Sequence, residues 1–179
     1  VAQLRNRRNL PWPSVVGIAR VVPKAGAAGL TVHPRPDERH IRRGDVYELA
    51  DFLSAEYPHA EFNIEGYPTP DFLALCAAVK PAQVTLVPDD PTQNTSDHGW
   101  DVSGAASFLT PIIAGIHDHG ARVSLFIDAD TRRPAEARAV GADRVELFTG
   151  PYGGALEAEE RDRQLDLLRL TAEAAAAAG

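Results

Sequence analysis

Residues 61–87 read EFNIEGYPTPDFLALCAAVKPAQVTLV and contain one complete strand–helix–strand unit. We expect strands at 61–65 and 83–87, because both segments are short and are followed closely by glycine or proline. The intervening residues 70–80 begin with proline, which is favoured in the first turn of a helix. Two consecutive strands joined through a helix lie parallel, with a right-handed crossover. This stretch therefore predicts a parallel α/β sheet.

The same alternation of strands and helices continues on both sides of this unit. Further strands are expected at 30–33, 122–128 and 144–149. Helices are expected at 14–22, from an N-cap at Asp45, at 103–119, at 134–139 and at about 157–178. We expect Pro111 to kink or split its helix, and the glycine-rich residues 150–154 to form a turn.

This alternation is compatible with two architectures. One is an open doubly wound sheet, and the other is part of an eight-stranded (β/α) barrel, which needs roughly 250 residues. The pattern of elements does not distinguish them. No linker or internal repeat divides the sequence, so we expect residues 1–179 to form a single domain.

The composition is typical of a globular protein, with 44% hydrophobic and 24% charged residues. The net charge of −7 disfavours nucleic acids and anionic membranes as partners, because both attract clustered positive charge. The single cysteine, Cys76, excludes an internal disulfide and a cysteine zinc site. These features, and the lack of a long apolar run, lead us to expect a cytoplasmic protein.

Ionisable residues occur towards the carboxyl end of four expected strands. They are His33, Glu65, Asp128 and Glu146. Parallel α/β folds bind ligands at this edge of the sheet, and barrel enzymes carry their active sites there. Glu146 lies in an apolar segment, where a carboxylate needs a polar partner or a raised pKa. We therefore expect one polar pocket at this edge, although Asp128 and Asp130 taken singly are more typical of turn residues or helix caps.

The loop after the first expected strand, residues 34–43, is rich in arginine. It is either a solvated charged loop or a site for an anionic substrate, since arginine binds phosphate through two parallel hydrogen bonds. His117 and His119 lie on different faces of a helix and are interpreted as surface residues rather than metal ligands. The sequence contains neither a phosphate-binding P-loop nor a dinucleotide glycine motif.

Several segments resemble the family of pyridoxine 5′-phosphate synthases, which close the ring of vitamin B6. Residues 30–41, LTVHPRPDERHI, are similar to the signature loop of that family, and FNIE at 62–65 resembles its strand with an essential glutamate. SLFIDAD at 124–130 and VELFTGPY at 145–152 are similar to two further family blocks, in the right order. LRN at 4–6, followed by Arg8, resembles the first loop of the family.

This resemblance extends through the whole chain and implies a TIM (β/α)8 barrel. It also implies a reaction that condenses 1-deoxy-D-xylulose 5-phosphate with 3-amino-2-oxopropyl phosphate. The products are pyridoxine 5′-phosphate, inorganic phosphate and water, and no metal or organic cofactor is implied. A homo-oligomeric assembly is implied as well.

The site residues implied by the resemblance fall into two groups. The catalytic group comprises His33 and Glu65 as acid–base residues and Glu146 as a residue that acts on a charged intermediate or transition state. The substrate-binding group comprises Arg35, His40 and Thr95 for the deoxyxylulose phosphate and Arg8 for the other substrate.

In this family a first strand should precede Val1 and the last two strands should follow Gly179. We therefore expect an incomplete barrel and a gene product that is longer by about 60–80 residues. On the sequence alone, another phosphosugar-binding barrel enzyme, such as an isomerase or aldolase, stays open. A Schiff-base aldolase needs a lysine at a strand end, whereas Lys24 and Lys80 lie in or just after expected helices. A non-catalytic open α/β ligand-binding domain also stays open.

Overall fold

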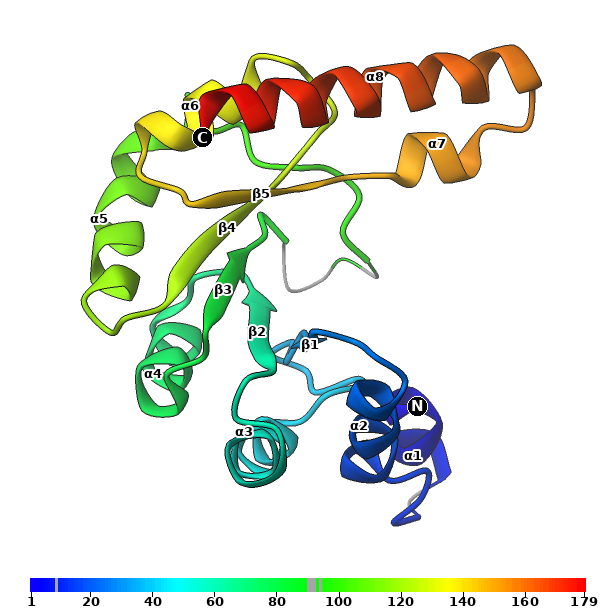
Figure 1. Cartoon of the computed structure of the whole chain (residues 1–179), viewed down its shortest axis with the longest axis vertical. Helices are drawn as coiled ribbons and strands as arrows, with labels where there is room; N and C mark the ends of the chain where they lie inside the picture. Colours follow the sequence, from blue (N-terminus) through cyan, green and yellow to red (C-terminus); the bar gives the residue numbers. More distant parts are fainter. Residues whose placement is uncertain (9, 90–92, 94) are drawn as a thin grey trace.

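The structure is a computed structural model that describes residues 1–8, 10–89, 93 and 95–179, without the side chain of Arg8. The strands are β1 (Gly29–Val32), β2 (Glu61–Gly66), β3 (Gln83–Leu86), β4 (Arg122–Ile127) and β5 (Arg144–Leu147). The helices are α1 (Ala2–Arg8), α2 (Val15–Lys24), α3 (Arg43–Glu56), α4 (Pro70–Val79), α5 (Ala106–His117), α6 (Arg133–Ala139), α7 (Gly150–Gly154) and α8 (Ala158–Ala178). All the strands expected from the sequence are present (Figure 1).

The described strands form one parallel sheet in the order β1-β2-β3-β4-β5. A doubly wound sheet reverses its direction of growth at a switch point, whereas a barrel adds each strand beside the preceding one. The sheet is also curved, and its helices lie on the outer side of the curve (Figure 1). The strand order and the curvature identify part of a (β/α) barrel and exclude the doubly wound alternative.

The apolar core lies between the sheet and the helices. Alternate strand residues face the helices and are fully buried, among them Ile64, Val84, Leu86, Leu125 and Ile127. They pack in one cluster with apolar residues of α3, α4 and α5. Side chains alternate between the two faces of a strand, so the remaining strand residues point to the concave face.

The concave face carries a polar network. Asn63 on β2 donates from Nδ2 to the Thr85 hydroxyl on β3 over 3.0 Å. Arg144 on β5 donates to Gln83 Oε1 at 2.8 Å and to Glu61 Oε1 at 2.9 Å. These bonds connect β2, β3 and β5 across the concave face. They help to fix the relative positions of the strands, whose carboxyl ends form one edge of the sheet.

Helix starts follow from local capping. Thr69 is the N-cap of α4, its hydroxyl accepts from the Phe72 N–H at 3.1 Å, and Pro70 occupies the first turn. The predicted N-cap of α3 at Asp45 is wrong, because Arg42 holds that position. Asp45 lies three residues later, and its carboxylate accepts from the Arg42 N–H at 2.8 Å, as in a capping box.

Other local expectations differ from the structure in part. Helix α5 continues through Pro111, so this proline does not split it. Pro111 has no backbone N–H, so the carbonyl group of Ser107 lacks its helical hydrogen bond. Ser107 is exposed, and its carbonyl group can bind water instead. Residues 150–154 form the short helix α7 rather than a turn, and α1 forms where the family resemblance implied a loop.

Helix α8 contains 21 residues and packs against α6 and α7. Its exposed side carries charged residues, including an ion pair between Glu160 and Arg163. Within the part of the chain that the structure describes, no helix is both long and apolar enough to cross a membrane.

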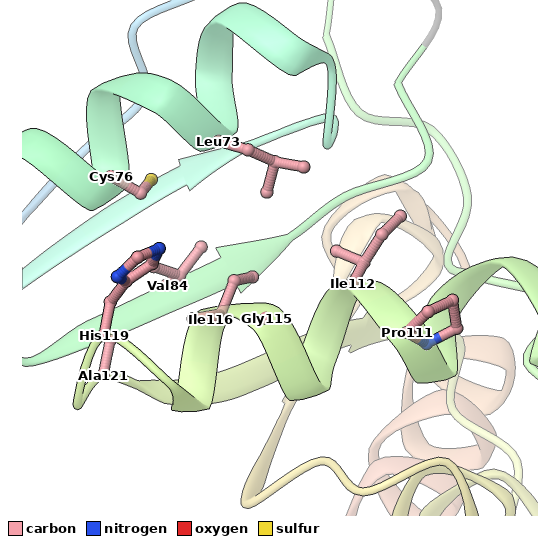
Figure 2. Close-up of a pocket in the computed structure, with 9 residues that line it drawn as sticks. All are labelled: Leu73, Cys76, Val84, Pro111, Ile112, Gly115, Ile116, His119 and Ala121. Carbon is pink, nitrogen blue, oxygen red and sulfur yellow. The ribbon is translucent and has the colours of Figure 1, made fainter.

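Helices α4 and α5 enclose an apolar cavity of about 330 Å³ beside β3 (Figure 2). Its wall includes Leu73, Cys76, Val84, Ile112, Ile116 and His119. Burial raises the pKa of the Cys76 thiol to about 12. The thiol therefore stays protonated and unreactive at neutral pH.

Gly115 lies within α5 on the wall of this cavity, and a Cβ atom added there would meet no atom within 4 Å. Alanine in a helix interior loses less conformational entropy on folding than glycine. We therefore expect Gly115→Ala to raise the free energy of unfolding by about 0.5–1 kcal/mol, as measured by denaturant unfolding. Gly99→Ala is the contrasting control, because its Cβ would approach the Asp128 backbone nitrogen to 2.3 Å and should destabilise the protein. Unchanged or lower stability of Gly115→Ala would contradict this prediction.

Candidate active site

The carboxyl edge of the sheet brings His33 and Glu65 together. His33 directly follows β1, and Glu65 is the next-to-last residue of β2. The register pairs Val32 with Ile64, so the two polar residues lie side by side one step further along. Nδ1 of His33 is 3.2 Å from Oε1 of Glu65, and each side chain is 17% exposed. This partly buried pair can exchange a proton while it remains accessible to a ligand.

Glu146 on β5 interacts electrostatically with this pair. Its side chain is open to solvent, yet surrounding protein atoms partly desolvate the carboxyl group. This desolvation raises the pKa of Glu146, and the negative charge of Glu65 raises it further, while His33 opposes the shift. The three groups thus share one electrostatic environment, although two strands separate β2 from β5. A carboxyl group with a raised pKa can carry a proton closer to neutral pH.

His40 adds a second imidazole from the loop between β1 and α3. Its ring packs edge-on against His33, with the ring centroids 6.0 Å apart. Its Nδ1 accepts from the backbone N–H of Ile41 at 2.9 Å, which places the proton of the neutral ring on Nε2. Burial lowers the pKa of His40, and nearby positive charges, first that of His33, lower it further. At neutral pH the ring is therefore an uncharged donor through Nε2.

Arg35 is buried and bound within the protein. Its Nη1 pairs with Asp89 Oδ2 at 2.8 Å, and both side chains are 4% exposed. Its Nη2 donates to the carbonyl oxygen of Gln93 at 2.9 Å, and Arg39 donates to the same oxygen. These bonds join the arginine-rich loop to the loop after β3, in which Thr95 lies exposed. The loops that carry three predicted binding residues are thereby held next to each other.

A cavity of about 370 Å³ lies beside the arginine-rich loop. It is lined by residues of both charges, including His33, Arg35, Glu38, Arg43, Asp71 and Asp89. Its volume is in the range of small-molecule sites. His33 therefore borders a space that can hold part of a small ligand, whereas Glu65 is not among the residues that line it.

Three other polar residues singled out by the sequence have structural partners. Asp128 accepts from a backbone N–H in the loop after β3 at 2.9 Å. Arg132 binds Asp130 through its side chain and backbone, and these bonds lower the pKa of Asp130 to about 2. His117 lies 2.8 Å from a carboxylate oxygen of Asp143. Asp130 is a turn residue and His117 is exposed, as expected, whereas Asp128 binds a neighbouring loop and caps no helix. The described residues include no cluster of three or more side chains suited to a metal ion.

Comparison with known families complements this geometry. The model of the family described as "Pyridoxal phosphate biosynthesis protein PdxJ" matches residues 1–179. The chain belongs to this family. The resemblance seen in the signature loop and the strand-end blocks is therefore confirmed for the whole chain.

Curated relatives of this PdxJ-family chain carry the name pyridoxine 5′-phosphate synthase. One from Mesorhizobium japonicum is 57% identical over 180 residues, which cover 100% of this chain and 73% of the relative. Relatives from Brucella abortus (strain S19) and Allorhizobium ampelinum are each 56% identical, with the same coverage.

Solved structures with a similar fold are more distant in sequence. A mandelate oxidase variant with (S)-mandelic acid has a TM-score of 0.57 at 17% identity and covers 91% of this chain and 53% of its own. A protein from Aquifex aeolicus VF5 has a TM-score of 0.52 at 17% identity and covers 84% and 62%, respectively. At this identity the likeness concerns the fold alone.

Two observations complete the site of the PdxJ-family chain. Arg8, the remaining predicted binding residue, ends α1, and its side chain lies outside the described residues. Asp89, the buried partner of Arg35, is not singled out by sequence reasoning. Its position just after β3 is the same strand-end signal that marks His33, so that signal could have found it.

Proposed function

We propose that this chain is part of the catalytic barrel of a pyridoxine 5′-phosphate synthase. It condenses 1-deoxy-D-xylulose 5-phosphate with 3-amino-2-oxopropyl phosphate and yields pyridoxine 5′-phosphate, inorganic phosphate and water. The observation that carries this proposal is the pair of His33 and Glu65 at the carboxyl edge of a PdxJ-family barrel.

The chemistry requires several proton transfers, because an imine forms, a ring closes, and water and phosphate leave. His33 engages Glu65 through Nδ1, which leaves Nε2 to exchange a proton with the substrate. Glu65 is the second acid–base group in this assignment. Glu146 stabilises positive charge that develops on the substrate, since its carboxyl group belongs to the same electrostatic environment.

The substrate-binding groups lie on the loops around this pair. We assign Arg35, His40 and Thr95 to the deoxyxylulose phosphate, and Arg8 to 3-amino-2-oxopropyl phosphate. His40 offers a neutral donor through Nε2, and the arginines offer charge to phosphate. The proposal involves no metal or organic cofactor and includes a homo-oligomer, as the family resemblance implies. It also includes a cytoplasmic location, as the composition leads us to expect.

Turnover by the full-length gene product tests the proposed function. Formation of pyridoxine 5′-phosphate that requires both phosphorylated substrates would support it. A phosphosugar isomerase would instead convert the deoxyxylulose phosphate alone, and a ligand-binding domain would bind without turnover. Either of these results would overturn the proposal.

Arg35→Lys tests whether Arg35, which already pairs with Asp89, also binds the phosphate group of the substrate. Lysine keeps the positive charge but loses the planar group that can bond two partners at once. We expect KM for 1-deoxy-D-xylulose 5-phosphate to rise about tenfold. The Kd of the unphosphorylated sugar should change less, and a melting curve shows whether the fold is kept. Equal losses for both ligands would show that Arg35 only joins the two loops.

A further inference from the structure

Helix α1 is anchored on the segment that follows His40. Arg5 forms two hydrogen bonds with Asp45, at 2.5 Å from Nη1 and 2.7 Å from Nη2. Asp45 is buried, and the side chain of Arg5 is 11% exposed. Burial alone would raise the pKa of Asp45, but the bonds from Arg5 and from the Arg42 N–H outweigh it and lower this pKa. The carboxylate is therefore charged at neutral pH and holds α1 against the first turn of α3.

Asn6 extends this contact to the loop itself. Its Nδ2 donates to the carbonyl oxygen of His40 at 2.8 Å and to that of Glu38 at 3.0 Å. Arg5 Nη2 adds a bond to the same His40 oxygen at 3.2 Å. Arg5 Nε also donates to Asn6 Oδ1 at 3.1 Å, which orients the amide so that its NH₂ group faces the loop. Two side chains of α1 thus hold one carbonyl group.

The loop held in this way contains an unfavourable backbone conformation. Glu38 has a φ of 52°, in the left-handed region that residues with a side chain seldom adopt. Such a residue persists when surrounding contacts determine its conformation. Here the Glu38 carbonyl is bound by Asn6, and its carboxylate accepts from the Arg43 N–H at 2.8 Å.

The held carbonyl belongs to the peptide unit between His40 and Ile41. The other side of this planar unit is the Ile41 N–H, which donates to Nδ1 of the His40 ring. The carbonyl and the N–H of one peptide cannot rotate independently. Fixing the His40 carbonyl therefore also fixes the N–H that determines which ring nitrogen of His40 carries the proton.

We propose that Arg5 and Asn6 are positioning residues for His40. They fix the peptide after His40, so that its imidazole stays against His33 and presents Nε2–H to the deoxyxylulose phosphate. The identity of this ligand rests on the proposed function, whereas the chain of hydrogen bonds does not.

Asn6→Ala in the full-length protein is the direct test. Gln3→Ala is the matched control, because Gln3 is an exposed residue of the same helix. In Asn6→Ala we expect the ¹⁵N NMR signals of His40 to move away from a pure Nε2–H tautomer. We also expect KM for 1-deoxy-D-xylulose 5-phosphate to rise about tenfold, with a smaller change in kcat. The charged and titratable groups around the ring, which are unchanged in both variants, are His33, Arg35, Arg39 and Asp37.

A second variant, Arg5→Lys, keeps the charge opposite Asp45 but loses the forked contact with Asn6 and His40. It should shift the His40 signals in the same direction as Asn6→Ala. A folded Asn6→Ala protein with unchanged His40 signals and unchanged KM would overturn the proposal. This holds even if its melting temperature is lower, because Asn6 would then contribute only to stability. If the wild-type protein makes no product, only the proposed function fails, because the His40 tautomer is measured without substrate.

Discussion

Glu65→Gln is expected to lower kcat of the full-length protein by about 10²–10⁴-fold and to leave the fold intact. Glutamine keeps the size of the side chain and can still bond to His33, but it cannot take up or release a proton. Glu65 lies at the partly exposed edge of the sheet, with its carboxylate 3.2 Å from His33 Nδ1. Its replacement therefore removes a titratable group without opening a cavity in the core.

The same substitution should change the titration of Glu146. The charge of Glu65 contributes to the raised pKa of Glu146, second to desolvation. Removing that charge should lower the pKa of Glu146 towards the ordinary range of glutamate, and Glu146 should then lose its proton at lower pH than in the wild type. An NMR titration of the side-chain carboxyl groups measures this shift independently of turnover.

Glu61→Gln is the matched control for Glu65→Gln. Glu61 lies at the opposite end of β2, where it binds Arg144 on β5. This control should lose some stability, because it weakens the ion pairs of Glu61 with Arg144 and Arg122, but kcat should stay close to that of the wild type. Near wild-type kcat in a folded Glu65→Gln protein would end the acid–base assignment.

The elements of the fold are predictable from the sequence, whereas the topology is not predictable from local patterns. Each strand and each of the longer helices has its own periodicity and boundary residues, as in Pro70 at the start of α4. The choice between a doubly wound sheet and a barrel depends on which strands pair. Pairing is a property of the whole sheet, and only the family resemblance favours the barrel before the structure is known.

The candidate site is predictable as far as it follows the strand ends. That rule selects His33, Glu65 and Glu146, which the structure places in one electrostatic environment. It also selects Asp128, which instead binds a backbone N–H. A carboxylate at a strand end can bind either a neighbouring loop or a ligand. Which of the two it binds depends on the loop conformation, and the strand pattern in the sequence does not predict that conformation.

The supporting contacts lie beyond sequence reasoning for a different reason. Arg35 and Asp89 are 54 positions apart, and Arg5 and His40 are 35 apart. Each contact joins two irregular loops or a loop and a short helix, so no periodicity relates the partners. They become visible only when the fold brings the segments together.

Asp89→Ala is expected to lower the free energy of unfolding by about 3–5 kcal/mol. The ion pair of Arg35 and Asp89 spans 2.8 Å, and both side chains are 4% exposed. Removing the carboxylate takes away the negative charge of Asp89 beside a buried guanidinium. The Ser96 hydroxyl, which donates to the same carboxylate at 2.8 Å, loses its acceptor as well.

The double variant Arg35→Met with Asp89→Leu separates the charge imbalance from the loss of the contact. Apolar side chains of similar volume need no counter-ion, so the double variant should recover much of the stability that Asp89→Ala loses. It should still bind 1-deoxy-D-xylulose 5-phosphate poorly, since it lacks Arg35. Denaturant unfolding of the wild type, Arg35→Met, Asp89→Leu and the double variant measures the coupling between the two residues. The free energy of unfolding of Asp89→Ala could instead fall by less than about 1 kcal/mol, which is typical of an exposed ion pair. That result would show that water reaches the guanidinium and that the ion pair does not hold the two loops together.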